Sequence, residues 1–328
     1  MNGQHVRTVW ILTTLVSVGA SGARTPPPAP GFATREAVMA AISSGKVKPI
    51  NPLIMASDDI EITRNIEYGK GGKVPLFLDL YRSKKNDQPV PGVIFIHGGA
   101  WAKGSKEVYH YYCVKYAERG YAVATIKYRL SDVAPFPAAV QDAKCAVRWM
   151  RANAGRYKID PDHIAVAGGS AGGHLAMMVG YTSDVAELEG DGGHAGVSSR
   201  VQAVVNLYGP TDLTTDFARQ AGSVKKFLGG QSYEQAPKQY ALASPITHLT
   251  KDDPPTLILH GTIDQIVPIS QADLLEKKLE ELQVPYVYDR LKGWPHTMDA
   301  AEPVNLRCRW FMDAFFEEHL RGKPKEKP

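Results

Sequence analysis

The residue whose neighbours most clearly suggest chemistry is Ser170, the centre of the run Gly168-Gly169-Ser170-Ala171-Gly172. An apolar stretch, 164–167, leads straight into this run, and a helix-compatible stretch, 171–181, follows it. A strand, a sharp turn and a helix in this order form a nucleophile elbow, which holds a serine hydroxyl at the end of a sheet. Glycine suits positions 168 and 172 because a Cβ there would collide with the adjacent strand or helix. The run therefore predicts a nucleophilic serine, although the same pentapeptide also occurs in ordinary turns.

A second glycine-rich turn lies upstream at 97–101, with the sequence His-Gly-Gly-Ala-Trp directly after the apolar stretch 93–96. Acyl transfer needs hydrogen-bond donors aimed at the carbonyl oxygen as it gains negative charge, and glycines let backbone N–H groups approach that oxygen. We expect the N–H groups of Gly98, Gly99 or Ala100, together with that of Ala171, to form the oxyanion hole. His97 precedes the serine, and we expect it to hold this loop rather than to act as a base.

An acid and a base are expected after the serine, on loops at the same edge of the sheet and with the acid first. Asp264 lies on a loop just past the strand-like stretch 256–260, and His296 lies on the loop after the last such stretch, 285–288. Ser170 would attack an ester carbonyl, His296 would accept its proton, and Asp264 would orient the imidazole. The alternatives are that Asp264 only caps a turn and that His296 is a surface residue.

Other titratable residues near these positions suit the roles less well. Asp299 follows the base and is a weaker candidate for the acid. His174 begins a buried helix and is expected to be a structural or pocket-wall residue, whereas His319 ends the last helix, where it would meet the helix dipole. Three aromatic residues near the inferred site could line an acyl or sugar pocket, and packing in the core explains them equally well: Trp101, Tyr208 and Trp294.

Taken together, these segments resemble the α/β-hydrolase superfamily and, within it, the hormone-sensitive-lipase-like esterases. The resemblance runs from about residue 61 to residue 320 and rests on residues 97–101, Tyr128-Arg129-Leu130, 135–139 with Asp142, 168–173, the Asp264 loop and His296. The tryptophan after the oxyanion loop and the stretch 187–194 are similar to the bacterial acetylxylan and feruloyl esterases. This resemblance implies small acyl or aromatic acyl groups on plant polysaccharide as substrates. Ala100 replaces the third glycine of the family's loop, which puts tolerance of bulky tertiary alcohols in doubt.

The elements that must position these residues follow from the hydrophobic pattern. Strands are expected at 60–68, 75–81, 92–97, 121–128, 163–167, 201–208, 255–260 and 285–291, the first two as an antiparallel hairpin. Helices are expected at 36–44, 105–119, 138–154, 171–182, 270–282 and 302–320. Strands alternating with helices indicate an α/β-hydrolase fold with a mostly parallel eight-stranded sheet covered on both faces. We also expect Arg129 to pair with Asp142 and brace the loop beside the oxyanion hole.

The chain of 328 residues divides into four predicted parts. Residues 1–23 read as a signal peptide, with a basic start, an apolar middle and small residues at the end, so the protein is expected to be secreted or periplasmic, with no stable membrane insertion. A membrane-anchored or disordered N-terminus is the alternative. Residues 24–50 form a proline-rich linker, mobile over 24–30, and an N-terminal arm; residues 51–322 form the catalytic domain, with a small helical cap at about 211–249. Residues 323–328 are a basic tail.

Composition excludes several classes of protein. The net charge of +4 comes with dispersed basic residues and no array of aromatic and basic side chains, so nucleic acid is not an expected partner. Cys113, Cys145 and Cys308 are expected to be buried free thiols, and no Cys or His spacing suggests a metal site. No cofactor is expected, and the oligomeric state is left open.

The sequence therefore predicts a secreted serine carboxylesterase that forms an acyl-enzyme on short acyl or aromatic esters such as acetyl and feruloyl esters. The main alternative is an amidase or peptidase of the same fold, similar to a formamidase or a prolyl oligopeptidase. A non-catalytic adhesion module is a third possibility, but such modules lose the nucleophile, and Ser170, Asp264 and His296 are all present.

Overall fold

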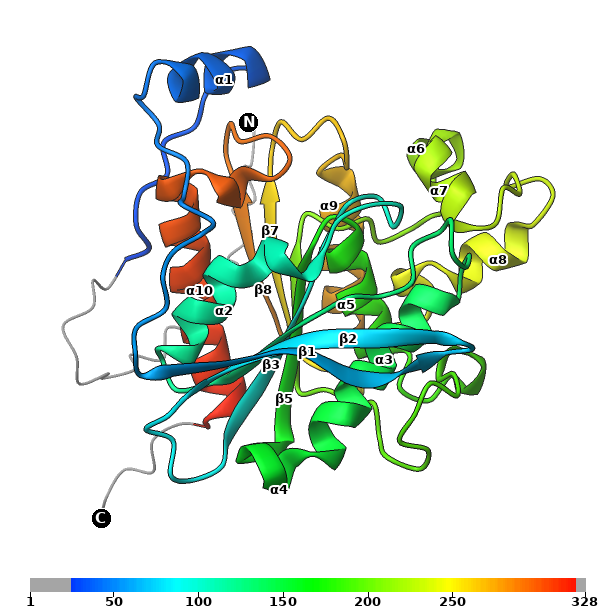
Figure 1. The fold of residues 1–328 in the computed structure, drawn as a ribbon. Helices are drawn as coiled ribbons and strands as arrows, with labels where there is room; N and C mark the ends of the chain where they lie inside the picture. The colour runs from blue at the N-terminus through cyan, green and yellow to red at the C-terminus, as the bar shows by residue number, and fades with distance from the viewer. Residues whose placement is uncertain (1–24, 323–328) are drawn as a thin grey trace.

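The computed structural model describes residues 25–322, so the predicted signal peptide (1–23) and basic tail (323–328) lie outside the described residues. The described chain is built on an eight-stranded sheet with helices on both faces (Figure 1). Its strands are β1 (Ile60–Gly71), β2 (Val74–Ser83), β3 (Val90–Ile96), β4 (Ala122–Ile126), β5 (Ile159–Gly169), β6 (Ala203–Leu207), β7 (Thr256–Gly261) and β8 (Tyr286–Leu291).

The strand order across the sheet is β1-β2-β4-β3-β5-β6-β7-β8. The pairs β1–β2 and β2–β4 are antiparallel, and every pair from β4–β3 to β7–β8 is parallel. Each of the eight predicted strands is present, and the first two form the expected hairpin. The α/β-hydrolase fold predicted from the sequence is confirmed.

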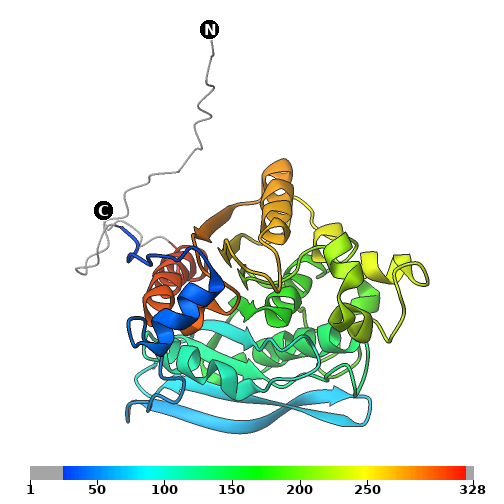
Figure 2. The same ribbon diagram turned by 90° about the horizontal axis from the view of Figure 1, so that it is seen from above.

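The sheet is buried on both faces, as its near-continuous apolar strands require. In β3, alternate residues enter opposite cores: Ile94 and Ile96 pack on one face, whereas Val93 and Phe95 pack on the other. The first core is shared with α3 (Ala138–Ala152), α5 (Ala171–Tyr181) and α9 (Ser270–Leu282), and the second with α2 (His110–Ala117) and α10 (Glu302–Leu320). The view from above shows these two helical layers with the sheet between them (Figure 2).

The segment predicted as a cap, between β6 and β7, contains α6 (Asp216–Gln220), α7 (Gly222–Phe227) and α8 (Pro237–Leu242). These short helices lie together at one side of the carboxyl edge of the sheet (Figure 1). The ring of Phe227 stacks on that of Trp101, with 4.4 Å between centroids and 14° between planes. The cap is therefore joined to the loop 97–101 by aromatic packing.

Two expectations about local structure differ from what is observed. The helix expected at 105–119 is a 3₁₀ turn, Lys106–Tyr109, followed by α2, and a short extra helix, α4 (Ala154–Tyr157), follows α3. The stretch 25–30 was expected to be mobile, but it is docked: the Pro27 carbonyl accepts from Arg307 and the Ala29 carbonyl accepts from the Trp294 indole, each at 3.1 Å. Extended proline-rich chain has free carbonyls, and the donors that bind them come from distant residues that local sequence does not reveal.

The remaining N-terminal arm includes α1 (Arg35–Ser43) and lies beside the upper end of α10 in both ribbon views. No helix among residues 25–322 is both long and apolar enough to cross a membrane.

Candidate active site

Ser170 occupies a strained turn between β5 and α5. Its φ is 57° and its ψ is −124°, a backbone conformation that side-chain-bearing residues rarely adopt. The turn is tight on both sides: a Cβ at Gly168 would lie 2.4 Å from the Gly172 carbonyl carbon, and a Cβ at Gly172 would lie 1.9 Å from the Ile96 carbonyl oxygen. Glycine is thus required at both positions, as the sequence predicted, and the serine hydroxyl is held at the carboxyl edge of the sheet.

The loops after β7 and β8 bring Asp264 and His296 to this serine. The Ser170 Oγ lies 2.9 Å from His296 Nε2, and His296 Nδ1 lies 2.6 Å from Asp264 Oδ2. A carboxylate only accepts, so Nδ1 carries the proton and Nε2 is free to accept one from the serine. The three residues separated by 126 and 32 positions in the chain therefore form one hydrogen-bonded series.

The Asp264 carboxylate is buried, and its oxygens accept several hydrogen bonds. Oδ1 accepts from the backbone N–H groups of Ile266, at 2.8 Å, and Val267, at 2.9 Å. Burial by itself raises the pKa of Asp264, but hydrogen bonds from His260, His296 and the Val267 amide outweigh it and lower that pKa to about 2. Asp264 is therefore a carboxylate throughout the pH range in which a histidine base would work.

A second histidine, His260, contacts the same carboxylate and was not identified from the sequence as a site residue. Its Nε2 donates to the Val267 carbonyl at 2.8 Å and lies 3.3 Å from Asp264 Oδ2, and its side chain is fully buried. His260 thereby ties the turn that presents Asp264 to the end of β7. Its position in the sequence could have indicated this contact, since a histidine at the end of a strand and four residues before the acid lies next to the loop that carries the acid.

The loop 97–101 lies against the nucleophile. A Cβ at Gly98 would lie 3.2 Å from Ser170 Cβ, and Gly99, Ala100 and Trp101 all have positive φ values of 112°, 54° and 54°. Among the hydrogen bonds between described residues, none uses the backbone N–H of Gly99, Ala100 or Ala171. These donors are free to bind a substrate oxygen, and Ala171 is the first residue of α5, whose N–H has no partner within the helix.

His97 holds this loop, as expected. Its Nδ1 lies 2.8 Å from the Gly98 carbonyl, and its ring stacks on Tyr128 with 4.3 Å between centroids. The Tyr128 hydroxyl in turn donates to the His97 carbonyl at 3.0 Å. Burial lowers the pKa of His97, which favours the neutral ring in this position.

The three aromatic residues proposed for a pocket have different surroundings. Trp101 is packed under the cap, where its indole N–H donates to His174 Nδ1 at 3.3 Å. Tyr208 contacts the His296 ring directly, with 4.8 Å between centroids. Trp294 is fully buried against the N-terminal arm, where Phe32 packs edge-on at 5.6 Å, so it belongs to the core behind the His296 loop and not to a pocket wall. A tryptophan near the site suggested a pocket wall. The sequence does not show that the N-terminal arm packs over this tryptophan.

Arg129 and Asp142 form the predicted ion pair. Arg129 Nη2 lies 2.6 Å from Asp142 Oδ1, Nε lies 2.9 Å from Oδ2, and the Arg129 backbone N–H donates to Oδ2 at 2.8 Å. Cys113, Cys145 and Cys308 are buried free thiols, as expected. Within the described part of the chain, no group of three His, Cys, Asp or Glu side chains could hold a metal ion.

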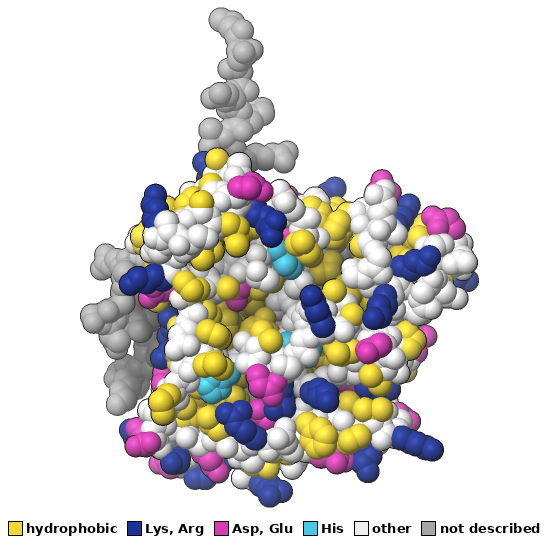
Figure 3. Space-filling model, turned by 45° about the horizontal axis from the view of Figure 1, so that its top comes forward, with side chains coloured by type: hydrophobic (Ala, Val, Ile, Leu, Met, Phe, Trp, Pro, Cys, Tyr) yellow, Lys and Arg dark blue, Asp and Glu magenta, His cyan; other side chains and the backbone are white. Residues whose placement is uncertain are grey.

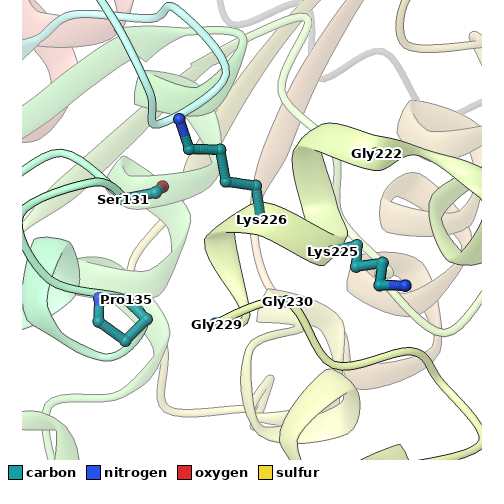
Figure 4. Close-up of a pocket in the computed structure, with 7 residues that line it drawn as sticks. All are labelled: Ser131, Pro135, Gly222, Lys225, Lys226, Gly229 and Gly230. Atoms are coloured by element: carbon teal, nitrogen blue, oxygen red, sulfur yellow. The ribbon is translucent and has the colours of Figure 1, made fainter.

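The face above the carboxyl edge of the sheet carries hydrophobic side chains around its centre, with many of the charged ones further out (Figure 3). An open cavity of about 550 Å³ lies beside the cap, lined by Ser131, Pro135, Gly222, Lys225, Lys226, Gly229 and Gly230 (Figure 4). None of these residues belongs to the series formed by Ser170, His296 and Asp264. One lining residue contacts the loop 97–101, because Ser131 Oγ donates to the Trp101 carbonyl at 2.9 Å.

Curated relatives of this chain are esterases. Esterase LipC of Mycobacterium tuberculosis is 33% identical over 229 residues, which cover 68% of this chain and 57% of LipC. The probable carboxylic ester hydrolase LipM of the same organism is 32% identical over 274 residues, covering 79% of this chain and 63% of LipM. The chain thus spans about three-fifths of the length of these relatives.

Solved structures similar to this one include a carbohydrate esterase. A truncated carbohydrate esterase from gut microbiota has a TM-score of 0.71 and 27% identity, covering 81% of this chain and 99% of that one. The bifunctional GH43-CE protein of Bacteroides eggerthii also has a TM-score of 0.71, with 30% identity, covering 81% of this chain and 36% of that one. The BD-FAE family model matches residues 78–279, which is more than half of the sequence. With the fold and these matches in agreement, this chain belongs to the BD-FAE family of α/β-hydrolase esterases.

Proposed function

We propose that this protein is a serine carboxylesterase whose catalytic triad is Ser170, His296 and Asp264. The observation that carries the proposal is the continuous series from Ser170 Oγ to His296 Nε2, 2.9 Å, and from His296 Nδ1 to Asp264 Oδ2, 2.6 Å. The direction of both hydrogen bonds leaves Nε2 as the acceptor, which is the form that a general base needs.

The reaction then proceeds in two halves. Ser170 Oγ attacks the ester carbonyl while its proton passes to His296 Nε2; collapse of the tetrahedral intermediate breaks the carbon–oxygen bond, and the proton passes to the leaving alcohol. Water, deprotonated by the same imidazole, attacks the acyl-Ser170 and releases the acid. Asp264 keeps the imidazole in the correct tautomer and stabilises the imidazolium that forms at each step.

The oxyanion hole in this proposal consists of the free N–H groups of Gly99, Ala100 and Ala171, with Gly98 allowing the loop to approach Ser170. Removing one such donor typically lowers kcat by a factor of about 10² to 10³. Glycine is needed at position 98 for this approach, because a Cβ there would lie 2.6 Å from the Gly169 carbonyl oxygen.

We further propose that the substrates are short acyl or aromatic esters, acetyl or feruloyl, carried by plant polysaccharide, and that the protein is secreted or periplasmic. Two observations support the substrate class. One structural neighbour is named a carbohydrate esterase, and the other carries the designation GH43-CE. The cap contains three short helices, and the segment 211–249 has few consecutive apolar residues. Export is supported by the signal-like composition of residues 1–23. The esterase names of the relatives favour ester over amide cleavage.

The Ser170→Ala variant tests the nucleophile. We expect kcat for p-nitrophenyl acetate to fall by at least about a thousandfold, because the acyl-enzyme can no longer form. Ser199→Ala is the control, since the Ser199 hydroxyl binds Glu189 and takes no part in the series formed by Ser170, His296 and Asp264. Turnover by Ser170→Ala equal to that of Ser199→Ala would remove Ser170 from the mechanism.

A substrate series tests the specificity. The wild-type protein is assayed with p-nitrophenyl acetate, butyrate and octanoate, with methyl ferulate and with acetylated xylan. The expected order has acetate or ferulate release well above octanoate hydrolysis, and measurable acetate from xylan. A preference for octanoate would contradict the carbohydrate-ester assignment, and turnover of an aminoacyl anilide without ester turnover would favour an amidase.

A further inference from the structure

Another buried carboxylate, Asp299, lies three residues after His296 and takes no part in the proposed triad. It belongs to the 3₁₀ turn Met298–Ala300, and only 7% of its surface is exposed. Its Oδ1 lies 2.5 Å from the Tyr208 hydroxyl, and its Oδ2 lies 2.9 Å from the Tyr112 hydroxyl. A carboxylate this deeply buried needs such partners, because an unpaired buried charge would strongly destabilise the fold.

The direction of these hydrogen bonds follows from an arginine at the far end of the network. The Arg309 guanidinium can only donate, and its Nε lies 2.9 Å from Asn305 Oδ1, which fixes the orientation of the Asn305 amide. Asn305 Nδ2 therefore donates to the Tyr112 hydroxyl at 3.0 Å. The Tyr112 proton is then available to Asp299 Oδ2, so Asp299 acts as the acceptor at that oxygen.

Tyr208 connects this carboxylate to the triad. Its hydroxyl makes no hydrogen bond with any other described residue, so it donates to Asp299 Oδ1. Its ring meets the His296 imidazole edge-on, at 66° and 4.8 Å between centroids. Its backbone has a φ of 44°, a left-handed conformation that persists only where the surroundings hold it.

The tyrosine hydroxyl also lies beside the nucleophile elbow. A Cβ at Gly169, the residue before Ser170, would come within 2.8 Å of the hydroxyls of both Tyr208 and Tyr109. The phenol of Tyr208 thus fills the space between the elbow, the imidazole and Asp299. The Tyr208 ring packs against the imidazole, so it limits how far the imidazole can tilt about its hydrogen bond to Asp264.

We propose that Tyr208 and Asp299 are positioning residues for His296: the Asp299 carboxylate anchors the phenol, and the phenol keeps the imidazole directed at Ser170. This inference rests on the proposed esterase function of the same site. The residues that contact the His296 ring are Ser170, Asp264 from the loop after β7 and Tyr208 from the end of β6. Asp299 acts on the ring through Tyr208.

The Tyr208→Phe variant tests the anchor, because it removes only the hydroxyl and leaves both the ring and Asp299. We expect kcat for p-nitrophenyl acetate to fall about tenfold, with KM changed less than twofold, since small misalignment of a catalytic group slows the chemical step. Tyr181→Phe is the matched control: Tyr181 is an equally buried tyrosine whose hydroxyl lies 2.7 Å from Thr256 Oγ1, away from the site. Its kcat should stay within twofold of the wild type even where its melting temperature falls.

The Asp299→Asn variant tests the same anchor from its other end. An amide has one accepting oxygen where the carboxylate has two, so it cannot accept from both Tyr208 and Tyr112. We expect a similar fall in kcat, again with KM changed less than twofold. Equal kcat for Tyr208→Phe and Tyr181→Phe would overturn the anchor, whether or not Asp299→Asn folds. If wild-type turnover does not depend on Ser170 at all, the proposed function fails instead.

Discussion

The imidazole of His174 is held as one neutral tautomer at the start of α5. Its Nε2 donates to the Ala243 carbonyl at 2.7 Å, and its Nδ1 accepts from the Trp101 indole at 3.3 Å. A proton on Nδ1 would point at the indole N–H of Trp101, which is also a donor, and the buried site has no water-accessible surface to relieve this. Burial accordingly lowers the pKa of His174 from 6.5 to about 4, with the Ala243 carbonyl opposing the shift only partly.

This shift predicts a pH-dependent stability. Between pH 6.5 and pH 4 the unfolded chain binds a proton at His174 and the folded chain does not, so folding stability falls as the pH decreases through that window. The loss attributable to this group is about 3 kcal/mol. Urea unfolding at pH 7 and pH 4 should therefore show a smaller acid-induced loss for His174→Gln than for the wild type, and no such difference for His163→Gln, whose side chain is 42% exposed.

The segment between β4 and α3 is braced by the Arg129–Asp142 pair. Asp142 is almost fully buried on α3, where burial raises its pKa while hydrogen bonds from the Arg129 side chain and backbone lower it. The same guanidinium closes against the β1–β2 hairpin, since a Cβ at Gly71 would lie 2.1 Å from Arg129 Nε. One side chain thus joins a loop, a helix and a hairpin beside the cap.

Arg129→Lys keeps the charge but loses the two-pronged geometry, because an ammonium group cannot match both carboxylate oxygens while filling the same plane. We expect the free energy of unfolding to fall by about 2 kcal/mol, which lowers the melting temperature by several degrees. The control is Arg82→Lys, whose partner Glu61 is about half exposed and whose pair should contribute little. Equal melting temperatures for the two variants would refute the bracing role.

The N-terminal arm holds the loop that carries His296 from two sides. Before His296 in the chain, the Gly293 carbonyl accepts from the Phe32 N–H at 3.1 Å. After His296, the Ala300 carbonyl accepts from the Ile50 N–H at 2.9 Å, and the Glu302 N–H donates to the Lys48 carbonyl at 2.8 Å. These contacts join the first and last parts of the described chain around the base. The arm is therefore part of the structure that supports the site.

Phe32→Ala tests this coupling across the molecule. Losing the edge-on contact with Trp294 should lower the free energy of unfolding by about 1 to 2 kcal/mol. We also expect kcat to fall several-fold, because the loop that carries His296 is then no longer packed against the N-terminal arm. Met39→Ala, on the exposed side of α1, should change neither quantity appreciably. Unchanged kcat in Phe32→Ala despite a lower melting temperature would show that the arm stabilises the fold without supporting the base.

Much of this protein could be predicted from its sequence because the relevant signals are local. Apolar runs bounded by glycine, proline and polar residues identified all eight strands, and a parallel sheet brings the carboxyl ends of its strands to one edge, so Ser170, Asp264 and His296 could be expected to meet. The glycines around Ser170 and in the 97–101 loop were likewise predictable, since positive φ and close backbone approach leave few other residues possible.

Tertiary structure alone decided which side chains surround those three residues. His260 contacts the same carboxylate as His296, Asp299 binds the Tyr208 hydroxyl, and Trp294 packs against the N-terminal arm. These arrangements depend on how distant segments of the chain pack together. The proline-rich stretch, expected to be mobile, is held by donors from α10 and the His296 loop. Periodicity and turn chemistry specify each element and its ends, whereas the partners of a buried polar group are set by the packing of all elements at once.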